Sequence, residues 1–367
     1  GGHRPQIERR ARQGLIMTEQ DEIIFRLQGS VGMVTLNRPY ALNALTHEMC
    51  LALDAKLAEW EGDSRVKLVL VEGAGDRAFC AGGDIIKLYE EGRKGADYPY
   101  HFYRDEYLLN ARIKHFSKPY ISFIDGIVMG GGVGVSVHGS HRVATERTLF
   151  AMPESGIGLF PDVGGSYFLP RCPGETGMYV GLTGARLKAD DAVFLGISNS
   201  YVHSEKLKNL EAALVAADYT DNIHHEIDVI IGQFSDHPGD APIIERLKQI
   251  DHHFGQFSVA EIIKSLQEDG DDWCLKTVDM LLTKSPTSMK VSFEELRRGA
   301  SMEFDDCMRM EFRMVNRIIQ GVDFYEGTRA AVVDKDRAPK WLPPTLEEIS
   351  DADVQAYFAP LEQGDLY

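Results

Sequence analysis

Two acidic residues stand in an apolar stretch of the chain. Glu154 and Asp162 occur in FAMPESGIGLFPDVGG, residues 150–165, among Phe, Met, Ile and Leu side chains. Burying a carboxylate is costly unless it is paired or neutralised. Desolvation also raises its pKa toward the range that suits general acid–base catalysis. The pattern therefore predicts two buried carboxylates that act on a substrate.

Helix-breaking residues separate these two acids. Pro153 and Pro161, with two glycines between them, rule out one continuous helix from Glu154 to Asp162. The chain must fold back, so both carboxylates could face one cavity. The alternative is a local role, in which Glu154 lies in the first turn of a helix and Asp162 caps the next one. We favour the cavity because the flanking residues are so apolar.

Two glycine clusters could supply backbone donors beside these acids. The first is FCAGGD, residues 79–84, and the second is GGGVG, residues 130–134. Each could point an N–H group, that of Gly83 or Gly131, at developing negative charge. Taken alone, the first motif is better explained as a tight turn with Asp84 capping a helix, and the second as close helix packing. Together they predict a two-donor oxyanion hole, which with nearby carboxylates is chemistry for a carbonyl group.

The elements that position these motifs alternate between strand and helix. Residues 23–27 and 31–36 are β-rich runs that predict a hairpin, and Thr46 predicts the start of an amphipathic helix. Residues 66–71 and 119–124 are continuous apolar runs, which are typical of strands covered on both faces. A helix around 102–116 lies between these two strands, and a short strand follows at 141–145. This alternation predicts an α/β fold.

The composition changes toward polar helices beyond Ala189. Amphipathic spacing predicts helices over 205–217, 243–254 and 259–267, and a long helical stretch from Met289 to about Gln320. Ser285-Pro286-Thr287 marks a break, so we place a boundary near Thr283. The expected organisation is a core with a helical insertion over 17–283 and a C-terminal helical region over 284–367.

Charge and cysteine content narrow the choice of partners. The formal net charge is 39 − 56 = −17, which argues against nucleic acid as the main partner. The five widely spaced cysteines, without a CxxC, suggest free thiols in a reducing compartment and indicate neither a disulfide framework nor a zinc site. No apolar run approaches the roughly 20 residues of a membrane span, so we expect no membrane partner.

The first sixteen residues are basic and lack the apolar segment of a secretory signal. We expect residues 1–16 to be a tag remnant or a disordered extension, with Met17 as the natural start and a transit peptide as the alternative. The expected location is the cytoplasm, or the mitochondrial matrix in a eukaryote.

Several motifs in order resemble one known family. NRPYALNAL at 37–45, FCAGGDI, GGGVGVSVHG and PES…FPDVGGSYFLPR are similar to the crotonase (enoyl-CoA hydratase/isomerase) superfamily, and the match covers residues 21–344. The resemblance implies a spiral of ββα turns with a C-terminal helical region. It also implies an acyl-CoA thioester as ligand, so that coenzyme A is part of the substrate and no separate cofactor or metal is expected.

The resemblance also assigns roles to single residues. By position, Gly83 and Gly131 match the family's oxyanion donors, Glu154 its catalytic carboxylate, and Asp162 a second catalytic acid found in the hydrolase branch. Glu106 matches a substrate-contacting glutamate, and Gly131, Glu154 and Asp162 are implied to contact the substrate as well. Without the family, Glu106 would be interpreted as an ordinary solvated helix charge.

One departure from the family pattern separates its branches. Hydratases of the superfamily carry a glutamate two residues after the glycine triplet, and this chain has Gly134 there. The resemblance therefore favours hydrolysis of the thioester of 3-hydroxyisobutyryl-CoA, a step of valine breakdown. The alternatives are an enoyl-CoA hydratase or isomerase and a non-catalytic acyl-CoA-binding protein. Because the superfamily often forms trimers or hexamers, a homo-oligomer is one expectation; an enlarged C-terminal half that covers this interface is the other.

Overall fold

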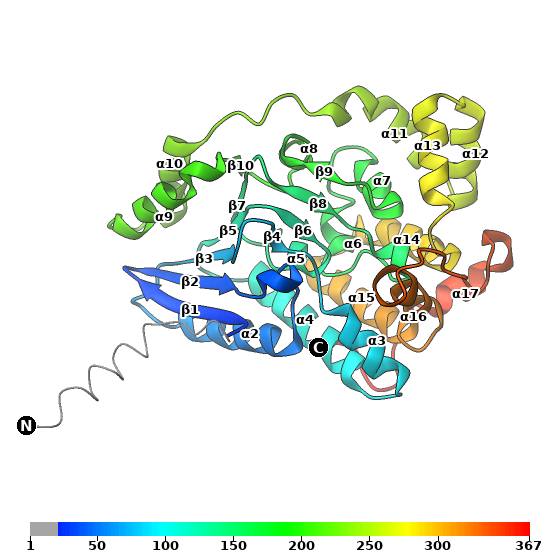
Figure 1. Cartoon of the computed structure of the whole chain (residues 1–367), viewed down its shortest axis with the longest axis horizontal. Coiled ribbons are helices and arrows are strands. Elements are labelled where there is room, and N and C mark those ends of the chain that lie inside the picture. The colour runs from blue at the N-terminus through cyan, green and yellow to red at the C-terminus, as the bar shows by residue number, and fades with distance from the viewer. Residues whose placement is uncertain (1–20) are drawn as a thin grey trace, which may run out of the picture.

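Two β-sheets and a set of surrounding helices make up residues 21–367, the part of the chain that this computed structural model describes (Figure 1). The extension expected at residues 1–16, with Met17, lies outside the described residues. The first sheet has the order β1-β2-β3-β5-β7-β10 and the second the order β4-β6-β8-β9. The strands are β1 Ile23–Gln28, β2 Val31–Leu36, β3 Leu68–Gly73, β4 Ala78–Cys80, β5 Tyr120–Ile124, β6 Ile127–Met129, β7 His141–Ala144, β8 Leu149–Ala151, β9 Leu187–Lys188 and β10 Ser200–Tyr201.

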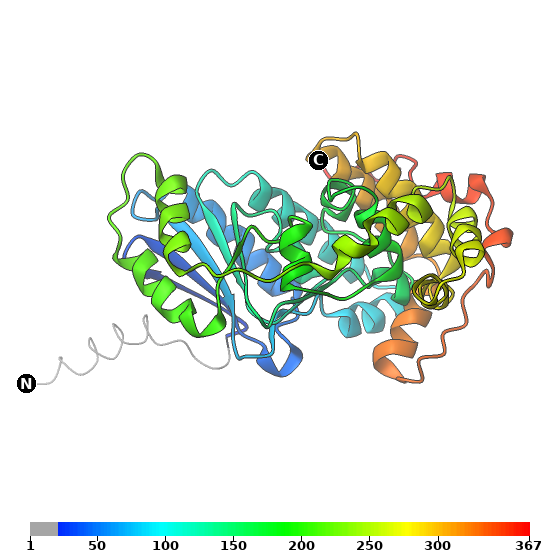
Figure 2. The same ribbon diagram turned by 90° about the horizontal axis from the view of Figure 1, so that it is seen from above.

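Helices cover the sheets and form the far end of the molecule, where α14 to α17 gather away from the sheets (Figure 2). The predicted α/β class is therefore confirmed. The helices are α2 His47–Glu61, α3 Ile85–Arg93, α4 Tyr98–Lys114, α5 Gly131–Gly134, α6 Gly165–Phe168, α7 Thr176–Thr183, α8 Ala189–Phe194, α9 Leu207–Ala216, α10 Ile223–Phe234, α11 Leu247–Phe254, α12 Val259–Asp269, α13 Asp272–Leu281, α14 Pro286–Gly299, α15 Phe304–Ile318, α16 Asp323–Thr328 and α17 Asp351–Ala356.

The large sheet is buried on both faces, which explains its unbroken apolar strands. Successive side chains of a strand point to opposite faces. Leu68 and Leu70 of β3 therefore pack in a cluster with residues of α9 and α10. Val69 and Val71 pack on the other face in the main core, which includes residues of α2 and α4. The antiparallel hairpin of β1 and β2 and the parallel pairing of β2, β3, β5 and β7 complete this sheet.

The small sheet brings three motifs to one edge. Strands β4, β6 and β8 are parallel neighbours. Their carboxyl ends, at Cys80, Met129 and Ala151, lead into the first glycine cluster, the second glycine cluster and the segment that carries Glu154. Ligands of α/β proteins bind where the carboxyl ends of parallel strands meet. The topology therefore places segments that are about 70 residues apart in the chain side by side.

The long helical stretch expected over 289–320 is instead two helices, α14 and α15. The chain breaks between Gly299 and Glu303, where Arg171 donates hydrogen bonds to the carbonyl oxygens of Gly299 (3.0 Å) and Met302 (2.8 Å). A Cβ on Gly299 would lie 1.9 Å from the Ser166 carbonyl oxygen, so the end of α14 packs directly on α6. A partner outside the helix thus satisfies carbonyls that a continuous helix would have used.

The polar second half follows the predicted pattern in outline. The helices expected over 205–217, 243–254 and 259–267 correspond to α9, α11 with a preceding 3₁₀ turn, and α12, whereas α10 and α13 were not predicted. Figure 1 shows an extended segment between α10 and α11, so this half divides into two separate helical groups. The boundary at 283/284 falls at the turn before α14 and stays a prediction, and the main core continues across it. Within residues 21–367, no helix is long and apolar enough to cross a membrane.

Candidate active site

All five predicted site residues line one cavity. Gly83, Glu106, Gly131, Glu154 and Asp162 surround a hollow of about 160 Å³ whose remaining walls are mostly apolar. A pocket for a drug-sized ligand measures roughly 300–1,000 Å³. The cavity therefore suits a small chemical group, such as a short acyl chain.

The first glycine bend connects β4 to α3. Leu45 holds it from both sides, since its N–H donates to the Gly82 carbonyl oxygen and its carbonyl oxygen accepts from the Asp84 N–H, both at 2.8 Å. Gly82 has a φ of +134°, which strongly favours glycine. In the described part of the chain, the Gly83 N–H has no acceptor. Asp84 caps α3 by accepting from the Lys87 N–H, so the capping role and a free Gly83 donor coexist.

The second glycine bend lies against the first. Gly130 has a φ of +50°, and Gly131 begins the short helix α5. A Cβ on Gly131 would lie 3.3 Å from the backbone nitrogen of Gly83, so the two bends are in direct contact. A Cβ on Gly132 would lie 2.0 Å from the Cys80 carbonyl oxygen. Tight packing therefore requires glycine here too, and it places the Gly131 N–H, which has no acceptor among residues 21–367, beside that of Gly83.

Glu154 reaches the same place from the end of β8. It is the first residue of a 3₁₀ turn after Pro153, and it is 4% exposed. A Cβ on Gly130 would lie 3.4 Å from one carboxylate oxygen of Glu154. Neither oxygen has a hydrogen-bond partner among the described residues. The local role expected in the alternative, a helix first turn, is thus observed together with a side chain that lines the cavity.

Asp162 lines the same cavity, after the turn that follows Glu154. Gly158 adopts the left-handed conformation that turns the chain between the two acids. The hydroxyl of Tyr107, from α4, donates a 2.8 Å hydrogen bond to Asp162. Asp162 is 4% exposed, and the next helix, α6, begins after Gly164 rather than at Asp162. Asp162 therefore does not cap that helix with its side chain.

Burial shifts the acid–base behaviour of this cluster. Desolvation, with the nearby Asp162 charge, raises the pKa of Glu154 well above its ordinary value. Desolvation raises the pKa of Asp162 to about 7, although the Tyr107 hydrogen bond works in the opposite direction. The pKa of Glu106 is raised by desolvation and then by both other acids. Like charges this close cannot all ionise, so near neutral pH the cluster can both accept and donate a proton.

The position of Glu106 differs from the solvated helix charge that its local sequence suggests. It is 2% exposed and lies on the inner face of α4, not in solvent. Phe102 and Asn110, four residues to either side, are also buried. The signal was available, because residues spaced by four lie on one helix face and Glu106 falls on the apolar one.

Two further residues, Tyr107 and Glu311, hold the site, and neither was predicted from the sequence. Tyr107 binds Asp162 as described. Glu311, fully buried on α15, accepts hydrogen bonds from the Gly164 N–H at 3.0 Å and from the hydroxyl of Ser166. It thereby ties the loop after Asp162 to the C-terminal helices. Its position on the buried stripe of α15 was the available signal.

No side chain would fit where the hydratase branch carries its second glutamate. A Cβ on Gly134 would lie 2.7 Å from the Cβ of Val163 and 2.8 Å from the amide nitrogen of Asn110. Such distances require the neighbouring atoms to move. The cavity therefore has no room for a glutamate from this position.

The sequence matches a profile of the family described as "Enoyl-CoA hydratase/isomerase" over residues 31–358. The chain belongs to this family. This enoyl-CoA hydratase/isomerase family member is 45% identical, over 97% of its length, to "3-hydroxyisobutyryl-CoA hydrolase, mitochondrial" of Xenopus tropicalis, and covers 94% of that protein. It is 44% identical to the Danio rerio protein of the same name, with 94% of this chain and 91% of that protein covered.

A solved structure supports the fold. The carnitinyl-CoA dehydratase of Mycobacterium thermoresistibile superposes with a TM-score of 0.88 at 39% identity, covering 94% of this chain and 98% of that one. This agreement confirms the crotonase-like spiral with a C-terminal helical region. The two kinds of relative carry names of different reactions, so the reaction must be argued from the site.

Proposed function

We propose that this chain hydrolyses the thioester of 3-hydroxyisobutyryl-CoA, giving 3-hydroxyisobutyrate and coenzyme A. The observation that carries the proposal is the convergence of two free backbone N–H groups and an unpartnered carboxylate, Glu154, on one small cavity within the described residues. The names of relatives that are 44–45% identical over nearly the whole chain support the substrate.

The backbone donors stabilise the charge that develops on the thioester oxygen. In the proposed complex, this oxygen lies between the N–H groups of Gly83 and Gly131. Each donor of this kind contributes ~3–4 kcal/mol to the transition state, because it is already oriented and shielded from water. The tight contact between the two bends keeps both donors in place without reorganisation.

Glu154 acts on the carbonyl carbon in one of two ways. It either attacks directly and forms a mixed anhydride, which water then hydrolyses, or it removes a proton from a water that attacks. Both routes break the C–S bond and release coenzyme A, whose sulfur takes up a proton. Neither carboxylate oxygen of Glu154 has a hydrogen-bond partner among the described residues, so the carboxylate is available for either route.

Asp162 and Glu106 complete the proposed chemistry. Asp162, with a pKa raised to about 7, positions Glu154 or a water, or supplies the proton for the leaving sulfur. Glu106 also lines the cavity, where an ideal Cβ on Gly131 would be 2.9 Å from its Oε2. We assign it to the substrate hydroxyl.

The site favours hydrolysis over water addition to a double bond. The hydratase route relies on a second glutamate at position 134, and the packing around Gly134 excludes one. A single carboxylate base beside an oxyanion site suits hydrolysis of a thioester.

A thiol-release assay across a panel of acyl-CoAs tests the proposal. We expect fast release of coenzyme A from 3-hydroxyisobutyryl-CoA and 3-hydroxypropionyl-CoA, slow release from butyryl-CoA, and no loss of the conjugated absorbance of crotonyl-CoA. Rapid hydration of crotonyl-CoA without thiol release would make the chain a hydratase. Absence of both activities would leave a binding protein.

The names of the relatives and the free cysteines of this chain support an expected cellular compartment for this activity. The relatives' names place those proteins in mitochondria, and the five cysteines here are buried and free. We propose a reducing compartment, the mitochondrial matrix in a eukaryote or the cytoplasm otherwise. A homo-oligomer stays a prediction, which sedimentation of the full chain would test.

A further inference from the structure

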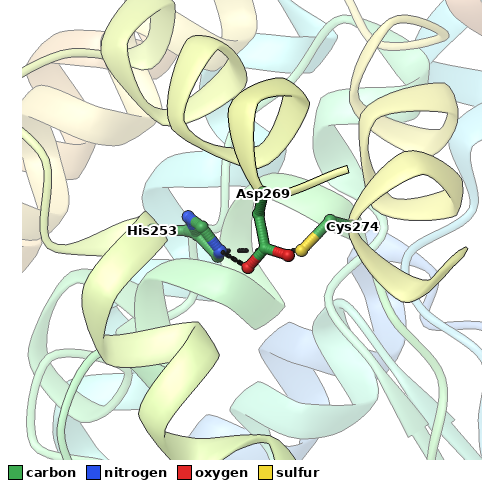
Figure 3. A group of neighbouring side chains, drawn as sticks. All are labelled: His253, Asp269 and Cys274. Carbon is green, nitrogen blue, oxygen red and sulfur yellow. Dashed lines mark hydrogen bonds and ion pairs between the residues drawn. The ribbon is translucent and has the colours of Figure 1, made fainter. Parts of the chain in front are cut away.

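A second cluster of reactive side chains lies in the helical group of α11, α12 and α13, outside the catalytic cavity. His253 at the end of α11, Asp269 at the end of α12 and Cys274 in the first turn of α13 point toward one another (Figure 3). None of the three lines the catalytic cavity. One ligand atom from each lies within 4.8 Å of the other two.

The nitrogen–sulfur distance within this trio matches that around a tetrahedral zinc ion, whereas the nitrogen–oxygen distance is that of a hydrogen bond. The Nε2 atom of His253 lies 3.5 Å from the Cys274 sulfur and 2.8 Å from an Asp269 oxygen. Zinc bonds of about 2.3 Å to sulfur and 2.0–2.1 Å to nitrogen put those two atoms roughly 3.5 Å apart. The oxygen needs to retreat only slightly to admit the ion.

Neighbouring groups orient the ligands as a metal site requires. The hydroxyl of Ser265 lies 2.7 Å from Nδ1 of His253, which directs Nε2 at the other two ligands when Nδ1 carries the hydrogen. Asp271 caps α13 by accepting from the Cys274 N–H at 2.7 Å, which helps to hold the turn between Asp269 and Cys274. The amide of Gln249 donates to Asp271 and also faces Asp269.

We infer that His253, Asp269 and Cys274 bind a zinc ion that joins α11, α12 and α13, with water as the fourth ligand. Histidine and thiolate ligands favour zinc over magnesium or calcium. A thiolate and a carboxylate neutralise the two charges of the ion. His253 and Cys274 are buried, whereas the Asp269 side chain is 30% exposed, which opens the fourth position to solvent.

Binding must release the thiol proton. A metal ligand must be deprotonated, so zinc competes with a proton and its affinity increases with pH. The expected role is structural, because the ion links three helices outside the active site.

Cobalt substitution of the full-length chain tests this inference directly. Chelator-stripped protein is titrated with Co²⁺, and thiolate-to-cobalt charge-transfer absorption is recorded; zinc content is measured on protein purified without chelator. The wild type should take up one ion per chain, show this band, and unfold at a higher temperature when loaded. Cys274→Ser should abolish the band, and His253→Gln should weaken binding by more than roughly the 10–100-fold typical of an outer-shell change.

Matched controls separate metal loss from misfolding. Cys172→Ser changes another buried cysteine, and His252→Gln changes the exposed neighbour of His253; both should bind like the wild type. Asp269→Asn, at an exposed position, should keep the fold and thioesterase turnover yet lose affinity. The inference is overturned if stripped wild type shows no thiolate–cobalt band and holds no zinc, or if the band survives Cys274→Ser.

Discussion

At the scale of single residues, the catalytic cavity depends on the absence of side chains as much as on their presence. Gly83 and Gly131 are in contact through their backbones, and the acids fill the walls around them. A methyl group on Gly131 would occupy the space between the Gly83 nitrogen and Glu106. The donors work only because nothing covers them.

Gly131→Ala tests the paired donors. Its methyl group would lie 3.3 Å from the Gly83 nitrogen, where the thioester oxygen is proposed to bind, so we expect kcat to fall by about 10²–10³-fold. Gly232→Ala, within helix α10, is the control, because a Cβ there meets no atom of residues 21–367 within 4 Å. The measurement is the steady-state turnover of both variants, compared after their unfolding temperatures have been shown to be equal. A Gly131→Ala variant as active as the control would exclude the oxyanion assignment.

Glu154→Gln tests the carboxylate. The amide cannot attack a carbonyl or take a proton from water, so turnover should fall by ~10²–10⁴-fold. Glu295→Gln removes another fully buried carboxyl, which does not line the cavity, and should keep turnover within a few-fold. Single-turnover thiol release would compare the two. Equal losses would mean that burial, and not catalysis, explains the effect.

The pH dependence of turnover should reveal the coupling between the acids. The base must be ionised, so kcat/KM should rise with pH as the cluster loses protons, and Asp162, with a pKa of about 7, places one step of this rise near neutrality. Asp162→Asn removes a negative neighbour, lowers the pKa of Glu154, and should move the acid limb to lower pH with a smaller plateau. Glu72→Gln is the control, because burial also raises the pKa of Glu72 to about 7 but this residue lies in β3 outside the cavity. If the acid limb of the pH profile moved by the same amount in Asp162→Asn and Glu72→Gln, the proposed coupling between the acids would be contradicted.

At the scale of elements, the active site is assembled by three parallel strands and held from behind by two helices. Strands β4, β6 and β8 deliver the two bends and Glu154 to one edge. Helix α4 supplies Glu106 and Tyr107, and α15 supplies Glu311. The C-terminal region is therefore part of the architecture of the site.

Glu311 should act on turnover through the loop that it holds. Glu311→Gln keeps one acceptor for the Gly164 N–H, whereas Glu311→Ala keeps none. We expect the alanine variant to lose up to about 100-fold in kcat, since displacing a catalytic group by about 1 Å costs this much, and the glutamine variant to lose less. KM should change little, because Glu311 does not line the cavity.

Asp306→Asn is the control on the same helix, because Asp306 pairs with Arg309 on the exposed face. A loss of kcat that increases from Asp306→Asn through Glu311→Gln to Glu311→Ala, measured with the full substrate, would support positioning. Equal stability loss with unchanged kcat would show that Glu311 serves the fold alone.

At the scale of the whole molecule, a set of buried carboxyl groups shapes stability. Glu106, Glu154, Glu295 and Glu311 are all buried, and burial raises the pKa of each. The folded state therefore binds protons more tightly than the unfolded chain does at these sites. Stability falls as pH rises through such a window.

We expect the unfolding temperature to decrease between about pH 4.5 and 8, the interval over which Glu311 titrates in the unfolded and the folded chain. Buried His138, whose pKa is lowered to about 3, opposes this trend at pH values below about 6.5, and exposed aspartates with lowered pKa, such as Asp63 at about 2, act only below the interval. Glu295→Gln should flatten the slope, because both oxygens of Glu295 lack partners within the described residues. Thermal unfolding followed by circular dichroism across this range is the measurement. An unfolding temperature that rises with pH in both proteins would contradict this role of the buried acids.

The sequence was sufficient for the parts of the fold that rest on local patterns. Local patterns predicted the first hairpin and strands β3, β5 and β7 of the large sheet but not β10, and Thr46 caps α2 as expected. The C-terminal helices were predicted less well. Their break depends on Arg171, which lies more than 100 residues away and captures the carbonyls at the end of α14.

The residues of the site can also be separated into those that local sequence patterns predicted and those that they did not. The glycine clusters and the apolar surroundings of Glu154 and Asp162 indicated carbonyl chemistry from residue types and spacing alone, because a charge buried among apolar residues is costly without a reason. Glu106 was predicted as a site residue only through the family resemblance, and neither Tyr107 nor Glu311 was predicted. Each is an ordinary polar residue of a helix until packing decides which face is buried.

The amino-acid sequence by itself determined the kinds of group in this protein: two backbone bends able to donate, acids placed among apolar residues, and strands covered on both faces. Only the tertiary structure decided which of these groups meet. The parallel order of β4, β6 and β8 brings the bends against each other, and the turn between α12 and α13 brings Asp269 and Cys274 to His253. Contacts between distant segments depend on the register and packing of whole elements, which no short motif records.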